Sequence, residues 1–208
     1  MGDRVSEPDP LVLGLSRGGV PVAFEVARSL HAELDIIVVR KLGLPGREEL
    51  AIGAVASGGV RVLNEQLIAE VQLSPQLIQR LTEAEEQELK RREELYRAGR
   101  SARAVSGRTV IVVDDGFATG ASMKAATQAV RARLPKRVVA AFPVAVKEAY
   151  DEFRMDVDEA ICRYTPQPFF SVGAWYEDFS QTSDDEVRQL LEMAARPGWL
   201  GARHYAVR

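Results

Sequence analysis

The stretch TVIVVDDGFATGASMKAA, residues 109–126, decides the fold of this chain. It begins with a continuous apolar and mostly β-branched run at 109–113, which is typical of a strand buried on both faces of a parallel sheet. Two acids, Asp114 and Asp115, follow directly, and a short turn then leads to a helical pattern from Met123. Ligands of open α/β sheets bind beyond the carboxyl ends of the strands, so this turn is predicted to lie at a binding site.

The residue types of this turn suit a phosphate group. Gly120 lets the backbone approach a ligand closely, and Thr119 and Ser122 add hydroxyl donors. The helix that follows presents unsatisfied N–H groups at its positive end. The two acids before the turn would be repelled by a phosphate, and they suit sugar hydroxyls or a hydrated Mg²⁺. The pattern indicates a sugar phosphate ligand, and the alternative is an ordinary strand–turn–helix unit with a glycine in its turn.

Residues 110–122, VIVVDDGFATGAS, resemble the phosphoribosyl diphosphate (PRPP) binding motif of type I phosphoribosyltransferases. That motif is an apolar strand, two acids, and a loop that ends in Thr-Gly-x-Ser/Thr. A Walker A loop would need Gly-Lys-Ser/Thr, which does not follow Gly120. The resemblance implies that Asp114 and Asp115 are catalytic residues, which hold the ribose hydroxyls and Mg²⁺. It also implies that the 5′-phosphate binds at Ala118, Thr119, Gly120, Ala121 and Ser122.

A second strand–loop–helix unit lies near the start of the chain. Residues 11–15 are predicted to form the first core strand, and Ser16-Arg17-Gly18-Gly19 forms the loop after it. Backbone N–H groups and Arg17 suit anionic oxygens. In type I phosphoribosyltransferases the first such loop holds the pyrophosphate. The resemblance therefore gives Arg17 a catalytic role at the leaving group and assigns substrate binding to Ser16, Gly18 and Gly19.

Residues 35–40 are predicted to form the next strand, with Arg40 and Lys41 at its carboxyl end on the same sheet edge. A solvated strand end is the plain alternative. The resemblance implies that Lys41 stabilises the departing pyrophosphate and that Arg40 binds substrate. Residues 42–49 are predicted to form a mobile loop, and 51–63 a hairpin. Family members close a flexible loop from this region over the site, which excludes water during transfer.

The rest of the core alternates between strands and helices. A long and mostly exposed helix begins at Ser74-Pro75, where serine is a preferred cap and proline a preferred first residue. Beyond the central stretch, the pattern predicts helices at 123–134 and 147–154 and strands at 137–144 and 159–163. This order predicts an α/β fold with a doubly wound, mostly parallel sheet flanked by helices. We expect a single domain, 1–208, with a core at about 11–165 and a small C-terminal hood at about 166–208.

Aromatic residues gather in the predicted hood. The family places its second substrate, usually a nucleobase, against a variable hood beside the core. Trp175 and Tyr176, with Phe169 and Phe170 before them, could provide a stacking face for a base. The equally weighted alternative is that these rings anchor the tail to the core. Trp175 and Tyr176 are the candidate residues for acceptor binding.

Composition limits the partners of the chain. A formal net charge of −3 over 208 residues gives no support for nucleic-acid binding. No apolar run approaches the roughly 20 residues of a membrane-spanning helix. The single cysteine, Cys162, excludes an internal disulfide. We expect a cytoplasmic protein without membrane or nucleic-acid partners, and a homodimer is compatible with the family, whose type I members commonly pair.

The leading functional hypothesis is Mg²⁺-dependent transfer of a phosphoribosyl group from PRPP to a nitrogen nucleophile, a nucleobase. The alternative is a non-catalytic domain that senses or binds PRPP or a nucleotide. A hydrolase that uses Asp114 as nucleophile fits less well, because haloacid-type sites have D-x-D. Family members that act on 6-oxopurines usually carry an acid where this chain has Ala118. The acceptor, the general base and the oligomeric state stay open at this point.

Overall fold

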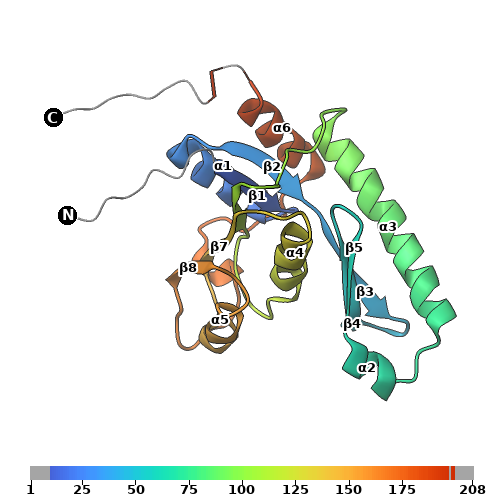
Figure 1. The fold of residues 1–208 in the computed structure, drawn as a ribbon. Coiled ribbons are helices and arrows are strands. Elements are labelled where there is room, and N and C mark those ends of the chain that lie inside the picture. Colours follow the sequence, from blue (N-terminus) through green and yellow to red (C-terminus); the bar gives the residue numbers. More distant parts are fainter. Residues whose placement is uncertain (1–9, 197, 200–208) are drawn as a thin grey trace.

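The structure is a computed structural model that describes residues 10–196, 198 and 199. Its centre is a five-stranded parallel sheet with the order β2-β1-β6-β7-β8 (Figure 1). The strands are β1 (Leu11–Leu15), β2 (Glu33–Ile37), β6 (Thr109–Val113), β7 (Arg137–Val144) and β8 (Glu159–Tyr164). The helices that connect or cover them are α1 (Gly19–Leu30), α4 (Ala121–Arg131), α5 (Lys147–Phe153) and α6 (Asp184–Ala194). The predicted α/β fold with a mostly parallel sheet is confirmed.

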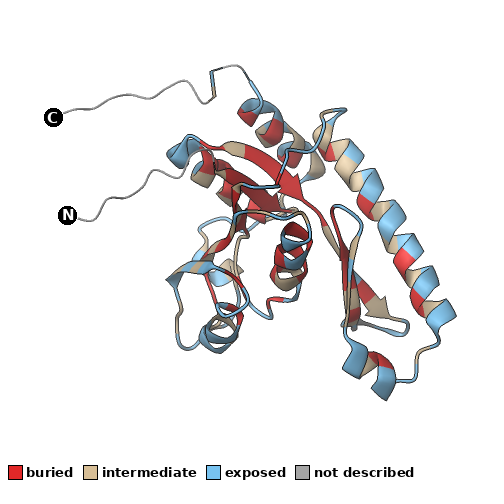
Figure 2. Ribbon diagram, in the orientation of Figure 1, coloured by how far each residue is buried: buried red, intermediate tan, exposed pale blue. Residues whose placement is uncertain are grey.

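The central strands are buried on both faces, as their apolar runs predict. In β1, Val12 packs into one hydrophobic cluster with α1 and α6. Leu11 and Leu13 pack into another cluster with α4 and Phe153 of α5. Successive side chains of a strand point to opposite faces, so the two clusters are the two sides of one sheet. The sheet is therefore wound on both faces. Figure 2 shows its inner strands as largely buried, whereas the edge strand β8 is mostly exposed.

A separate antiparallel sheet projects from the core and contains β3 (Val39–Leu44), β4 (Arg47–Ala56) and β5 (Val60–Leu63). It corrects two expectations. The strand expected at 35–40 ends at Ile37, because both backbone groups of Val38 bond to Ser57 instead of the parallel sheet. The loop expected at 42–49 is a hairpin whose ladder shifts register around Gly43. The glycines and the proline in this stretch made the sequence pattern indicate a loop. A β-bulge tolerates such residues, which a regular strand disfavours, so the strands can still pair.

Two helices cover this second sheet or extend from it. The short α2 (Glu65–Glu70) was not expected, and α3 (Pro75–Arg97) begins at its expected cap, where Ser74 Oγ accepts the N–H of Leu77. The outer face of α3 carries the expected ion pairs, such as Arg91 with Glu88. Its inner face is less exposed than expected, because its apolar stripe packs against β4 and α6 and buries Tyr96 completely.

Part of the hood expected at about 166–208 is the helix α6. The name hood is therefore kept for the segment between β8 and α6, residues 165–183. It has little regular structure, apart from one 3-10 turn at Gly173–Trp175. The following helix, α6, returns to the core and packs beside α1 and α3. The single-domain prediction for 1–208 stays a prediction, because both ends lie outside the described residues. In the described part of the chain, no helix is long and apolar enough to cross a membrane.

Candidate active site

The site is organised by two neighbouring parallel strands that end side by side. Gly14 of β1 pairs with Val113 of β6, so the loops that follow these strands emerge at the same edge of the sheet. The helix after β1 covers one face, and the helix after β6 covers the other. This is a topological switch point, where open α/β sheets form their ligand crevice. The structure therefore brings the two sequence motifs together.

Two glycines allow the loop after β1 to lie directly on the acids after β6. A Cβ atom at Gly18 would overlap Asp115 Oδ2. A Cβ atom at Gly19 would lie 2.6 Å from the carbonyl oxygen of Val113 and 2.8 Å from Asp114 Cα. The loop backbone can approach the carboxylates this closely only because neither residue has a side chain. The peptide bond between Ser16 and Arg17 is cis.

The acid pair carries unfavourable charge when no ligand is present. Burial, followed by the charge of Asp115, raises the pKa of Asp114 well above its usual value. Burial also raises the pKa of Asp115. Backbone hydrogen bonds oppose both shifts: Asp114 Oδ1 accepts the N–H of Asp115 at 2.9 Å, and the N–H groups of Gly116 and Asp115 lower the pKa of Asp115. Within the described residues, no Lys, Arg or His forms an ion pair with either acid. A cation or a set of hydroxyl donors would relieve the charge.

This donor set fits a magnesium ion that the ligand helps to hold. Mg²⁺ prefers oxygen ligands and commonly binds through one or two carboxylates, with water and substrate phosphates completing its shell. The described residues include no cluster of three or more side chains that could form a metal site by themselves. Asp114 and Asp115 would therefore supply only part of the coordination, directly or through water.

The turn between β6 and α4, residues 114–120, ends in a glycine-capped helix. Gly120 has φ +73°, and a Cβ atom there would overlap the ring of Phe117. Phe117 is buried and stacks on Phe142 with a centroid distance of 4.8 Å, which anchors the turn. Beyond it, Ala118, Thr119 and Ala121 are exposed and Ser122 is half-buried. The first N–H groups of α4 thus face a surface that an anion can reach.

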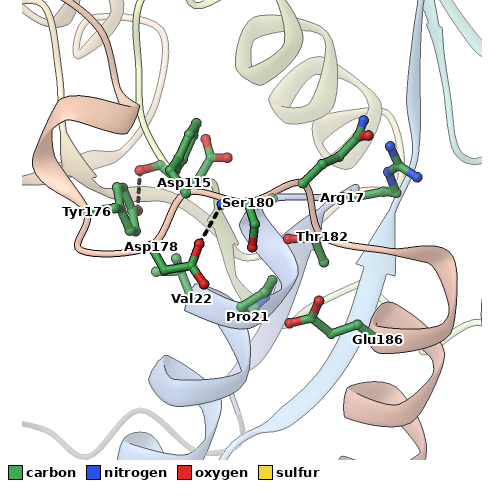
Figure 3. A pocket seen from close by; sticks show the side chains of 12 residues that line it. Arg17, Pro21, Val22, Asp115, Tyr176, Asp178, Ser180, Thr182 and Glu186 are labelled. Atoms are coloured by element: carbon green, nitrogen blue, oxygen red, sulfur yellow. Dashed lines mark hydrogen bonds between the residues drawn. The ribbon is translucent and has the colours of Figure 1, made fainter.

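A cavity of about 500 Å³ lies on the other side of the loop after β1 (Figure 3). Arg17, Gly18 and Asp115 contribute to its wall from the sheet edge, and Pro21 and Val22 contribute from α1. The hood and the start of α6 supply the remaining wall: Tyr176, Asp178, Phe179, Ser180, Gln181, Thr182 and Glu186. The cavity therefore joins the predicted pyrophosphate loop to the hood.

The hood is attached to the β6–α4 turn at two points. Tyr176 Oη donates a hydrogen bond to the backbone carbonyl of Asp115, as Figure 3 shows. Val172 packs on Gly116, where a Cβ atom would lie only 2.5 Å from Val172 Cγ1. Burial, with the charges of Asp115 and Asp114, raises the pKa of Tyr176 to about 12, so the phenol stays an O–H donor at neutral pH. The hood wall of the cavity is thus attached to the β6–α4 turn.

The structure separates several residues that the sequence grouped together. Trp175 stacks on Tyr164 with a centroid distance of 6.4 Å, and it does not line the described cavity. Arg40 and Lys41 lie in β3 rather than at the end of β2. Arg40 Nε donates to Glu85 of α3 at 2.7 Å, and the Lys41 side chain is exposed. Arg17 lies at the cavity and pairs with Asp184 at 3.3 Å.

Sequence reasoning missed most of the hood residues that line the cavity. Asp178 accepts the N–H of Ser180 at 2.8 Å, which is a local turn that a D-x-S pattern could indicate. That hydrogen bond lowers the pKa of Asp178, so its carboxylate is charged at neutral pH. Phe179 packs against Tyr176 with a centroid distance of 5.1 Å. Glu186 carried no signal beyond its place in the first turn of a capped helix.

Comparison with known proteins identifies the family. The family model described as "Phosphoribosyl transferase domain" matches residues 3–177. Two Mycobacterium tuberculosis proteins, from strains CDC 1551 / Oshkosh and H37Rv, are each 48% identical to this chain over 186 residues. Their names are "Putative phosphoribosyl transferase MT0597" and "Putative phosphoribosyl transferase Rv0571c". The alignment covers 89% of this chain but only 42% of each relative's length.

A solved structure shares the fold of this chain. The crystal structure of TT1426 from Thermus thermophilus superposes with a TM-score of 0.79 at 43% sequence identity. That alignment covers 91% of this chain and 90% of the other. The strand order and the switch-point site define a type I phosphoribosyltransferase-like fold. This chain belongs to the phosphoribosyl transferase domain family, as the resemblance predicted.

Proposed function

We propose that this chain transfers the phosphoribosyl group of PRPP to a nitrogen of a nucleobase and releases pyrophosphate. One observation carries the proposal: the glycine loop after β1, the acid pair and the glycine-capped start of α4 belong to adjacent strand ends. These parts match the leaving group, the sugar and the terminal phosphate of one ligand. Family membership supports PRPP-dependent transfer, and the nucleobase is the finer step proposed here.

Each group has a chemical role in this scheme. The exposed turn and helix start, Thr119 to Ser122, bind the 5′-phosphate through N–H and hydroxyl donors. Asp114 and Asp115 hold the ribose hydroxyls. Arg17 and the backbone at Gly18 bind the pyrophosphate. Lys41, which lies exposed in β3, is proposed as a further pyrophosphate contact on the family resemblance alone. Bound Mg²⁺, held in part by the acid pair, supplies positive charge to the phosphate oxygens.

The transfer breaks the bond between C1 of the ribose and a pyrophosphate oxygen. The electron pair leaves with the pyrophosphate, where the cation of Arg17 stabilises the developing charge. The acid pair stabilises the positive charge that develops on the sugar. The acceptor nitrogen forms the new bond at C1, and its proton passes to the released pyrophosphate. The hood forms a wall of the cavity next to the acid pair, and an acceptor bound there would displace water that competes with it.

The cavity wall favours an acceptor that offers hydrogen-bond donors. Asp178 and Glu186 present carboxylate oxygens there, and Tyr176 and Phe179 present rings. An aminated or N–H-rich base suits this wall better than an anionic base. The small Ala118 also argues against a 6-oxopurine. A cytoplasmic location and a homodimer stay predictions of the sequence.

The test is a screen for pyrophosphate release with PRPP, Mg²⁺ and a panel of nucleobases. We expect release with at least one neutral, amino-bearing base and none when PRPP or Mg²⁺ is omitted. Binding of PRPP without release by any base in the panel would favour the sensing alternative and contradict the enzymatic proposal.

A further inference from the structure

The pyrophosphate loop makes one side-chain contact with a distant part of the chain. Arg17 Nη1 lies 3.3 Å from Asp184 Oδ1, although the two residues are 167 positions apart. The Arg17 side chain is 27% exposed and that of Asp184 is 41% exposed. Arg17 lines the cavity, whereas Asp184, the first residue of α6, is not among its lining residues. Asp184 therefore contacts Arg17 from outside the predicted ligand space.

Asp184 is itself held in place by a buried residue of a third element. Tyr96 Oη, in the last turn of α3, donates to the same Asp184 oxygen at 2.7 Å. The Tyr96 side chain is fully buried, so its hydroxyl has a fixed position. Arg100 Nη1 also donates to the carbonyl of Leu191 at 2.7 Å, which ties the end of α3 to α6. Asp184 is thus a defined acceptor rather than a mobile surface acid.

The protonation states of Asp184 and Tyr96 agree with this arrangement. The hydrogen bond from Tyr96, followed by the charge of Arg17, lowers the pKa of Asp184, which stays ionised at neutral pH. Burial, followed by the hydrogen bond to Asp184, raises the pKa of Tyr96 to about 12. The phenol therefore donates, and the carboxylate accepts from both Tyr96 and Arg17.

Arg17 keeps donors for an anion while it is held in this way. A guanidinium has five N–H donors in a rigid fork, and the contact with Asp184 uses Nη1. Within the described residues, Nε and Nη2 of Arg17 have no hydrogen-bond partner. An arginine that is oriented before the ligand arrives loses less rotamer entropy on binding than a free one. One oxygen of Asp184 can therefore fix the orientation of the Arg17 guanidinium and leave its other N–H donors free to bind an anion.

We propose that Asp184, oriented by Tyr96, is a positioning residue that holds the Arg17 guanidinium ready for the pyrophosphate of PRPP. The proposal deepens the proposed function and rests on it, since it assumes that Arg17 binds the pyrophosphate. It links the C-terminal helix and the end of α3 to the leaving-group side of the site.

The test separates the two ends of the ligand by calorimetric titration. The full chain is titrated with Mg²⁺-pyrophosphate and, separately, with ribose 5-phosphate. We expect Asp184→Asn to weaken pyrophosphate binding by about tenfold, because the amide oxygen can still accept but the negative charge that orients Arg17 is lost. Binding of ribose 5-phosphate should stay within about twofold, because its phosphate binds at the start of α4. A purely structural role of Asp184 would weaken both ligands together, and that result would overturn the proposal.

Two further variants sharpen the test. Asp185→Asn is the matched control, because Asp185 lies in the same helix turn, is exposed, and pairs with Arg188 at 3.1 Å. It should bind both ligands as the wild type does. Tyr96→Phe keeps the buried ring and removes only the hydroxyl, and it should weaken pyrophosphate binding about twofold to threefold. If Asp184→Asn does not fold, the pyrophosphate affinity of Tyr96→Phe tests the positioning role in its place. In an Arg17→Ala background, Asp184→Asn should have no further effect.

Other outcomes distinguish this proposal from the proposed function. If the wild type binds PRPP and pyrophosphate and Asp184→Asn binds pyrophosphate equally well, the positioning role is wrong and the function stands. Tighter pyrophosphate binding by Asp184→Asn would mean that the carboxylate withholds Arg17, which also overturns the proposal. If the wild type binds none of these ligands, the proposed function fails and this inference fails with it.

Discussion

The β6–α4 turn and the hood meet at Asp115 and Gly116, yet they are built in opposite ways. The turn is defined by backbone: glycine at positions where a side chain would collide, a buried phenylalanine, and a helix start. The hood is defined by side chains on an irregular segment, attached through Tyr176 and Val172. One half of the site is therefore specified by local sequence, and the other half by contacts between distant segments.

The largest effect is expected in the turn. The double variant Asp114→Asn with Asp115→Asn keeps the shape of both side chains and removes the charges that hold the sugar and Mg²⁺. We expect pyrophosphate release to fall by about 10³-fold or more. Thermal melting should show that the variant is folded. Turnover at the wild-type rate would show that the acid pair is not catalytic.

The junction between turn and hood should respond more moderately. Gly116→Ala places a methyl group against Val172, and overpacking of this kind costs about 1–3 kcal/mol. We expect the hood to shift, so that the acceptor KM rises about tenfold while PRPP affinity is unchanged. Adding Val172→Ala to the same chain should restore the acceptor KM. Failure of that rescue would mean that the hood does not form the acceptor wall.

A smaller effect is expected within the hood. Tyr176→Phe removes the hydrogen bond to the carbonyl of Asp115, which is worth about 1 kcal/mol. For a chain of this size that corresponds to a fall in Tm of about 2–4 °C. Scanning calorimetry measures it directly. An unchanged Tm would show that the phenol does not fasten the hood. Trp175→Phe is the control for acceptor binding, because Trp175 stacks on Tyr164 and does not line the cavity.

The smallest effect concerns stability and pH. A carboxyl whose folded-state pKa is raised stabilises the fold at low pH, and that contribution is lost as pH rises through the folded pKa. Asp114 has this sign, so Asp114→Asn should raise Tm at pH 7 by a few degrees. The gain should shrink as pH falls.

Asp158 provides a control of opposite sign for this pH experiment. Its carboxylate accepts the N–H of Val138 at 2.7 Å, and that hydrogen bond lowers its pKa. The stability that it contributes is present at neutral pH and lost as pH falls through its folded pKa. Asp158→Asn should therefore lower Tm at pH 7. An equal fall in Tm for both variants would contradict the assignment of unfavourable charge to the acid pair.

The same comparison explains how far the sequence could be interpreted. Continuous apolar runs predicted the buried strands, and β6 and β7 begin and end at the predicted residues. The acid pair, the glycine turn and the loop after β1 are each short local patterns, and sheet topology then brings them together. This half of the site needed no knowledge of distant contacts.

The remaining half could not be predicted because its causes are not local. Nothing near Arg40 indicates that Glu85 of α3 pairs with it, and nothing near Arg17 indicates Asp184. The aromatic cluster of the hood predicted one stacking face. In the structure, Tyr176 lines the cavity, whereas Trp175 stacks on Tyr164. Adjacent side chains diverge in irregular segments, and no periodicity says which one faces the site.

If the turn, the acid pair and the loop after β1 form one site for PRPP, calorimetric titration of the chain with PRPP should detect it, with and without Mg²⁺. We expect binding in the micromolar range that requires Mg²⁺ and is lost in the double variant of Asp114 and Asp115. The absence of PRPP binding in either condition would contradict it.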